Sequence, residues 1–149
     1  MIRKFLLADD DEDDSDMFRE ALLDIDASLE FERAKNGREL LSRLSSQSAL
    51  PEIIFLDINM PEMNGWECLA ELRQHEKWKS IPVLLYSTSS PEINGRKAIE
   101  WGAVGLYEKA VNYKVFRKFL RSITETSPSQ LSGTLRSLKE SKEHSIYIG

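Results

Sequence analysis

Short apolar runs alternate with amphipathic segments along the first 124 residues of the chain. The strand-like runs cover residues 2–8, 29–32, 53–57, 82–87 and 104–108. Apolar residues between and after these runs recur at helical spacing, as in Met17, Phe18, Ala21, Leu22 and Ile25 and again in Val115, Phe116, Phe119, Leu120 and Ile123. Pro91 stands where the fourth helix should begin, a position that favours proline. The pattern predicts five strand–helix repeats.

Strict alternation of strands and helices predicts an α/β fold. The crossovers should be right-handed, and the sheet should be parallel with helices on both faces. With five strands, the natural arrangement is a doubly wound, flavodoxin-like sheet of order 2-1-3-4-5. Leu29 and Phe31 alternate with glutamates, which suits an edge strand, whereas the continuous apolar run before Asp57 suits the centre.

The composition changes after residue 124. Residues 125–149 are rich in Ser, Thr, Lys and Glu, and Pro128 and Gly133 interrupt them. Leu131, Leu135 and Leu138 could form one stripe of a short helix. We therefore expect one domain over residues 1–124 and a tail over 125–149 that is flexible or forms a short extra helix, too small to be an output domain.

Length, charge and cysteine content narrow the class of protein. The chain has 149 residues, 41% of them hydrophobic, which suits a single core. Its net charge of −5 argues against binding to nucleic acid. There is no signal-peptide pattern and no apolar run of membrane-spanning length, so we expect no membrane contact. Cys68 is the only cysteine, which excludes an intrachain disulfide and suits a cytoplasmic location.

Carboxylates follow two strands that should be neighbours in the sheet. Asp57 ends the third apolar run, and Asp9 and Asp10 end the first. In the order 2-1-3-4-5 these residues meet at one edge, where open α/β sheets bind ligands. Carboxylates in one crevice raise each other's pKa unless a cation joins them. Oxygen ligands of this kind suit Mg²⁺. The following acids, Glu12, Asp13 and Asp14, are interpreted as a solvated helix start.

The last two strands end in a hydroxyl and a lysine. Ser87 can donate a hydrogen bond to a phosphoryl oxygen, and Lys109 can neutralise its charge. Each group alone is commonplace. Together with the carboxylates they support phosphoryl transfer to Asp57 as the nucleophile, with the metal and Lys109 spreading the developing charge.

This combination resembles the receiver domain of two-component response regulators of the chemotaxis-regulator type. The resemblance covers about residues 1–124. It is carried by Leu7-Ala8-Asp9-Asp10-Asp11, by the ten residues from Leu56 to Gly65, by Pro82 to Ser87, and by Gly102-Ala103 before Lys109.

The resemblance implies a stand-alone receiver that signals rather than an enzyme with its own substrate. A sensor histidine kinase or a histidine phosphotransfer protein would phosphorylate Asp57. Asp10, Asp57 and the backbone carbonyl of Asn59 would bind Mg²⁺, with Asp9 acting through water. Ser87 and Lys109 would contact the phosphoryl group. The phosphorylated form would bind an unknown downstream protein near residues 91–115, and receivers of this type often associate as homodimers through the fourth and fifth helices.

Two positions depart from the family pattern. Ala110 follows Lys109 where receivers usually have a proline in a cis peptide, so the peptide could be trans or strained cis. Leu106 stands at the usual aromatic switch position. Tyr107 should face the other side of its strand, and Tyr86 is a candidate substitute.

Two alternatives use the first acidic cluster differently. A haloacid-dehalogenase-like phosphatase would use Asp9 and Asp11, but it would need a later acidic metal ligand and leaves Asp57 unexplained. An EF-hand would use Asp9, Asp11, Asp13 and Glu20, but it requires glycine where Asp14 stands and a helix where a strand is predicted.

Overall fold

A computed structural model describes all residues from 1 to 149. Strands and helices alternate through the first five repeats, as predicted. The elements are β1 (Lys4–Ala8), α1 (Glu12–Ile25), β2 (Glu30–Ala34), α2 (Gly37–Ser46), β3 (Ile53–Asp57), α3 (Gly65–Gln74), β4 (Val83–Ser87), α4 (Pro91–Glu100), β5 (Gly105–Glu108) and α5 (Tyr113–Thr124). A 3₁₀ turn (Pro128–Gln130), α6 (Leu131–Glu140) and β6 (Ile146–Tyr147) follow.

The sheet has the order β2-β1-β3-β4-β5-β6. Its first five strands are parallel, which confirms the predicted doubly wound core. The sixth strand is an addition that the sequence pattern did not predict, and it pairs antiparallel with β5. Both β3 and β4 are buried along their whole length, whereas β2 at the edge is partly exposed.

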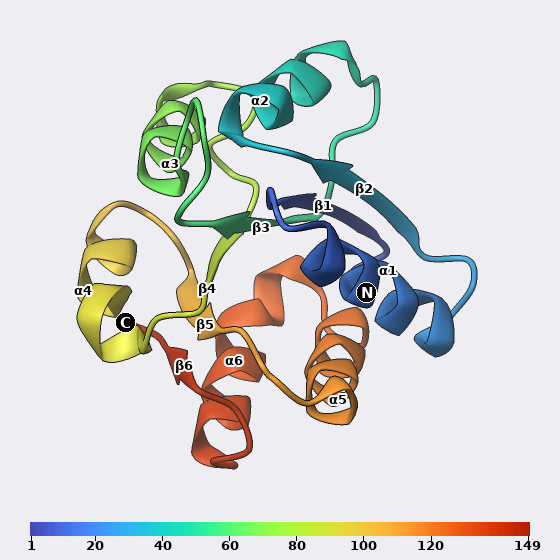
Figure 1. Ribbon diagram of the computed structural model, residues 1–149. Helices are drawn as coiled ribbons and strands as arrows, with labels where there is room; N and C mark the ends of the chain where they lie inside the picture. The colour runs from blue at the N-terminus through green and yellow to red at the C-terminus, as the bar shows by residue number, and fades with distance from the viewer.

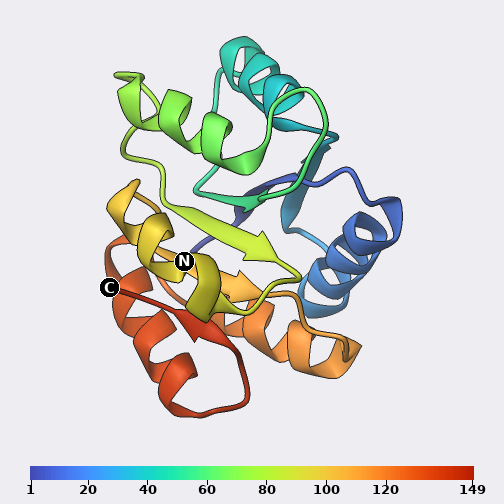
Figure 2. The ribbon, with the colours of Figure 1, turned by 60° about the vertical axis from the view of Figure 1, so that its left-hand side comes forward.

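Two hydrophobic layers cover the sheet, one on each face. The first layer combines α1 and α5 with α6 and includes the rings of Phe18, Phe55 and Phe119. The second combines α2, α3 and α4 and includes Cys68, a buried free cysteine. Figures 1 and 2 show α2 and α3 together on one side of the sheet, with α1 and α5 on the other.

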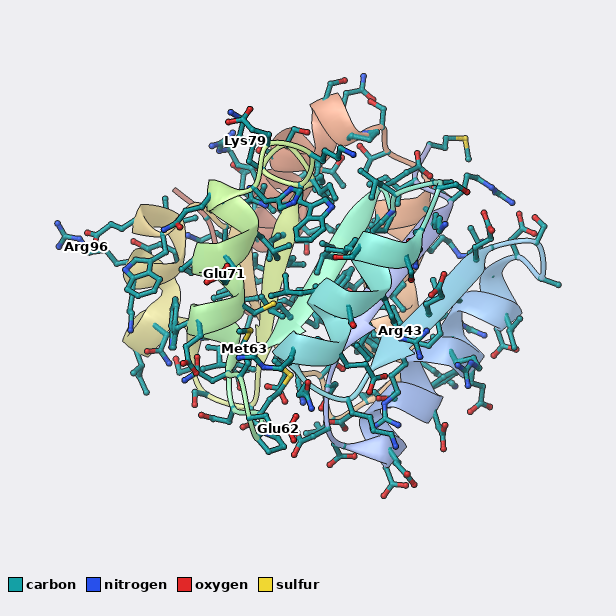
Figure 3. The ribbon with its side chains drawn as sticks, turned by 90° about the horizontal axis from the view of Figure 1, so that it is seen from above. Arg43, Glu62, Met63, Glu71, Lys79 and Arg96 are labelled. Atoms are coloured by element: carbon teal, nitrogen blue, oxygen red, sulfur yellow. The ribbon has the colours of Figure 1, made fainter.

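The two ends of the sheet differ in character. Figure 3 shows Glu62 and Met63, which follow the carboxyl end of β3, at the opposite end of the sheet from Lys79, which precedes β4. The loops at the carboxyl ends of the strands carry the acidic residues identified above. No helix combines the length and apolar composition needed to cross a bilayer.

Residues 125–149 pack against the domain. Leu131 and Leu135 of α6 are fully buried in the first hydrophobic layer. The backbone N–H of Glu108 donates to the carbonyl of Ser145, which begins the pairing between β5 and β6. On the other face, the ring of Tyr147 lies directly over Gly95 of α4, where a Cβ atom would come within 2.2 Å of it. The last helix and strand are thus part of the folded unit (Figure 1).

Candidate phosphoryl-acceptor site

The strand ends bring the predicted site residues together. Asp9 is fully buried just after β1, and Asp57 is 7% exposed at the end of β3. These strands are neighbours, with Ala8 beside Leu56 in the register. Carboxylate oxygens of Asp9, Asp10 and Asp57 lie within 4.8 Å of one another. The apolar strands therefore deliver three carboxylates to one crevice.

Lys109 reaches into this crevice from the end of β5. Its Nζ lies 3.0 Å from Asp9 Oδ2 and 3.5 Å from Asp57 Oδ2. The shortest ion pair, 2.7 Å, is with Asp14 Oδ2 in the first turn of α1. Burial opposes the charge on Lys109, but its bond to Asp14 and the nearby charges of Asp57 and Asp9 outweigh this and raise its pKa. The ammonium is therefore charged at any physiological pH.

Burial at the end of β3 makes ionisation of the Asp57 carboxyl group unfavourable. Burial raises its pKa from 3.8 to about 7, Lys109 opposes this rise, and the charge of Asp9 adds to it. Half of the Asp57 carboxyl groups would hold a proton near neutral pH. A protonated carboxyl is a poor nucleophile, and further positive charge near Asp57 would favour its ionised, nucleophilic form.

The carboxylate cluster has a suitable size for a divalent cation. Oxygen ligands lie about 2.1 Å from Mg²⁺ in octahedral geometry, so they are separated by about 3 to 4 Å. A spread of 4.8 Å needs only a small contraction to match this. Asp10 is exposed and Asp9 and Asp57 are buried, which leaves an open side toward solvent. The donor set of oxygens without nitrogen or sulfur also suits Mg²⁺ or Mn²⁺.

The loop after β3 comes close to the backbone of Asp57. The N–H of Gly65 donates to the carbonyl of Ile58 at 2.8 Å. A Cβ atom on Gly65 would lie 2.3 Å from the carbonyl oxygen of Asp57, so only glycine fits this approach. Asn64 then caps α3 with a capping box. Asn59, whose carbonyl was an expected metal ligand, lies exposed in this loop two residues beyond Asp57.

Ser87 ends β4, the strand that neighbours β3 in the sheet. It is 1% exposed, and its Oγ accepts a hydrogen bond from the N–H of Ser89 at 3.1 Å. The carbonyl of Ser87 accepts from the N–H of Lys109 at 2.7 Å. Ser87 and Lys109 are thereby joined through the backbone, and the segment after Ser87 leads within three residues to Pro91 at the start of α4.

The two departures from the family pattern have clear structures. No peptide bond is cis, so Ala110 follows Lys109 through a trans bond, and Lys109 still reaches the carboxylates. Leu106 is fully buried in the α2–α3–α4 layer, and Tyr107 faces the α1–α5 layer as the strand alternation predicts. Tyr86 also lies on the α1–α5 side, so its ring cannot substitute on the side where Leu106 packs.

Asp14 is the residue that sequence reasoning assigned wrongly. Its side chain was expected to be a solvated part of the helix start, but it makes the closest contact to Lys109. The spacing of the buried residues along α1 could have predicted that this side chain points inward. Asp14 lies four residues before Phe18 and seven before Ala21, both fully buried, so it continues the inward stripe of α1.

The structure also argues against both alternatives. The carboxylate of Asp11 is the N-cap of α1 and accepts from the N–H of Asp14 at 2.9 Å, which commits it to the helix rather than to phosphatase chemistry. Asp13 and Glu20 lie on the exposed side of that helix and cannot be loop ligands of an EF-hand.

Comparisons with known proteins agree with this geometry. A family model described as the response regulator receiver domain matches residues 5–121. The response regulator Rcp1 of Synechocystis sp. is 30% identical over 123 residues, covering 79% of this chain and 84% of Rcp1. Its Mn²⁺-bound crystal structure superposes with a TM-score of 0.70 at 30% identity over 80% of this chain and 89% of that one. The chemotaxis response regulator CheY4 of Vibrio cholerae gives a TM-score of 0.68 at 33% identity over 81% and 98%.

Some relatives are much longer proteins. The chain spans 7% of the length of a histidine kinase P4 from Formosa agariphila and 12% of the sensor histidine kinase CheAY from Helicobacter pylori. The part that this chain shares with its relatives is a receiver domain. The fold, the acidic crevice and the family match over residues 5–121 all support this assignment. The chain belongs to the response regulator receiver domain family of two-component signalling proteins, and the haloacid-dehalogenase alternative finds no support.

Proposed function

We propose that this chain accepts a phosphoryl group on Asp57 from a phosphohistidine of a sensor kinase or phosphotransfer protein and signals by binding another protein. An Oδ atom of Asp57 forms a bond to phosphorus while the phosphorus–nitrogen bond of the donor breaks, its electron pair staying with the imidazole. The observation that carries the proposal is the convergence of Asp57, Asp9 and Lys109 at one end of the sheet, where Ser87 ends the neighbouring strand β4.

Each residue has a distinct proposed task. Asp9, Asp10, Asp57 and the carbonyl of Asn59 would hold Mg²⁺, which supplies charge that keeps Asp57 ionised and stabilises the phosphoryl oxygens when it is bound. Lys109 neutralises charge on the transferred group, and Ser87 donates a hydrogen bond to one of its oxygens.

The output surface is proposed to lie near residues 91–115. Three large apolar side chains are exposed there, Ile93 at 73%, Trp101 at 41% and Val111 at full exposure. Movement of Ser87 toward a phosphoryl group would pull the short segment that joins it to α4. Because Tyr147 lies on Gly95 and β6 pairs with β5, the C-terminal strand would follow any shift of α4 against β5.

Intact-mass measurement tests the phosphoryl-acceptor role. Incubation with acetyl phosphate and Mg²⁺ should add one phosphoryl group to the wild-type chain and none to Asp57→Asn. Asp13→Asn is the matched control, because it makes the same chemical change at an exposed aspartate outside the cluster of Asp9, Asp10 and Asp57. Modification that persists in Asp57→Asn would show that another residue is the acceptor.

Binding partners test the signalling role. A pull-down that compares phosphorylated wild type with Asp57→Asn should recover a protein with the phosphorylated form alone. Identical sets of bound proteins would contradict a phosphorylation-dependent output.

A further inference from the structure

The ammonium of Lys109 is held by three carboxylates from three separate elements. Its contacts are Asp9 after β1, Asp57 at the end of β3 and Asp14 in the first turn of α1. An ammonium has three N–H donors, so these acceptors use its whole donor capacity. The Nζ atom also lies over the ring of Tyr86, 4.8 Å from the ring centroid.

Asp14 differs from the other two partners in its relation to the metal cluster. Oxygens of Asp9, Asp10 and Asp57 can converge on a cation, and Asp14 is not among them. A divalent cation in that cluster would draw Asp9 and Asp57 toward itself and repel the ammonium. Asp14 would then be the one carboxylate of the three still free to hold Lys109.

Asp14 is also firmly placed. Its backbone N–H donates to the side chain of Asp11, which caps α1, and Ser15 Oγ donates to the carbonyl of Asp11 in the same turn. Its side chain is about one-third exposed, compared with 9% for Lys109. Asp14 therefore approaches Lys109 from the solvent side of the crevice, from a fixed helical turn.

We propose that Asp14 is a positioning residue that holds Lys109 at the rim of the crevice until a phosphoryl group arrives and then competes with that group for the ammonium. The inference rests on the proposed phosphoryl-acceptor function and adds a restraint to it. With the metal bound, Asp14 is the carboxylate that still holds Lys109, so the ammonium must turn from Asp14 to reach a phosphoryl oxygen on Asp57. Asp14 thereby sets how readily the phosphorylated arrangement forms.

Removal of the Asp14 charge should favour the phosphorylated arrangement. The probe is beryllofluoride, which mimics a phosphoryl group on a carboxylate, titrated into the full chain at saturating Mg²⁺ and followed by ¹⁹F NMR. Asp14→Asn should lower the apparent Kd three- to tenfold. Asp14→Glu, which keeps the carboxylate, should return the Kd to within twofold of the wild-type value.

The matched control separates contact from general charge. Asp13→Asn removes the same charge from the same turn, but Asp13 is exposed and has no contact with Lys109. It should change the Kd less than twofold. A role confined to helix structure would lower the affinity or leave it unchanged in Asp14→Asn.

Several results would overturn the inference. An unchanged or higher Kd in Asp14→Asn would do so, and so would equal gains in Asp14→Asn and Asp13→Asn. If the wild-type protein still binds beryllofluoride in those experiments, only the inference about Asp14 fails, and the proposed role of Asp57 as phosphoryl acceptor is unaffected. Wild-type protein that neither binds beryllofluoride nor gains mass with acetyl phosphate would instead refute the proposed function itself.

Discussion

Asp57→Asn should make the metal-free protein more stable above neutral pH. The carboxyl of Asp57 sits at the end of a buried strand, where burial raises its pKa from 3.8 to about 7 despite Lys109. Because the folded pKa is the higher one, the folded state binds this proton more tightly than the unfolded chain. The stability that this binding gives is complete below pH 3.8 and is lost as the pH rises through about 7.

The size of the effect follows from the two pKa values. A rise in pKa from 3.8 to about 7 corresponds to about 4 kcal/mol of lost stability once the carboxyl is ionised in the fold. Solvent that enters the open side of the crevice reduces this value. We therefore expect Asp57→Asn to raise the free energy of unfolding by about 2 to 4 kcal/mol at pH 8, and by less than about 1 kcal/mol near pH 4.

Urea unfolding of both proteins across this pH range, with EDTA present, measures the difference. Comparison of the two proteins at each pH cancels the other titrating groups. Added Mg²⁺ should then stabilise the wild type more than Asp57→Asn. A variant that is no more stable than the wild type at pH 8 would refute the view that Asp57 is a strained, desolvated carboxylate.

Three glycine substitutions probe close contacts elsewhere. Gly65→Ala places a Cβ atom 2.3 Å from the carbonyl oxygen of Asp57, so it should cost about 2 kcal/mol or more in urea unfolding and slow phosphorylation by acetyl phosphate; wild-type values for both would contradict this. Gly95→Ala displaces the ring of Tyr147, so amide exchange in β6 should accelerate while the rest of the sheet stays protected. Gly133→Ala meets nothing within 4 Å in the first turn of α6 and should add up to about 1 kcal/mol of stability, and a loss would show that this helix is strained.

Hydrophobic patterning was sufficient to predict the core of the sheet. The uninterrupted apolar run before Asp57 predicts a central strand that is buried on both faces of the sheet. The alternating pattern around Phe31 predicts a strand at the edge of the sheet. The site followed from topology, because carboxyl ends of parallel strands share one edge. Asp9, Asp57, Ser87 and Lys109 were therefore predictable as neighbours, although their distances were not.

The parts that escaped prediction depend on tertiary context. Ile146 and Tyr147 form a strand of two residues, too short for any periodicity to reveal. The residues that β6 contacts, on β5 and at Gly95, are distant from it in the sequence, so no local pattern predicts these contacts. Asp14 stood among five similar acids, and only the phase of α1 distinguished the one that faces Lys109.

The short strand β6 has a consequence for how copies of this protein meet. A sheet that ends in an unpaired apolar strand invites the same edge of another molecule, and β5 would be such a strand without β6, because Leu106 and Tyr107 in it are both hydrophobic. The opposite edge carries Glu30, Glu32 and Arg33 on β2, whose charges discourage pairing. By pairing β5 with its own chain, the protein leaves at this edge only the two residues of β6, a strand too short to serve as a template for the sheet of another molecule.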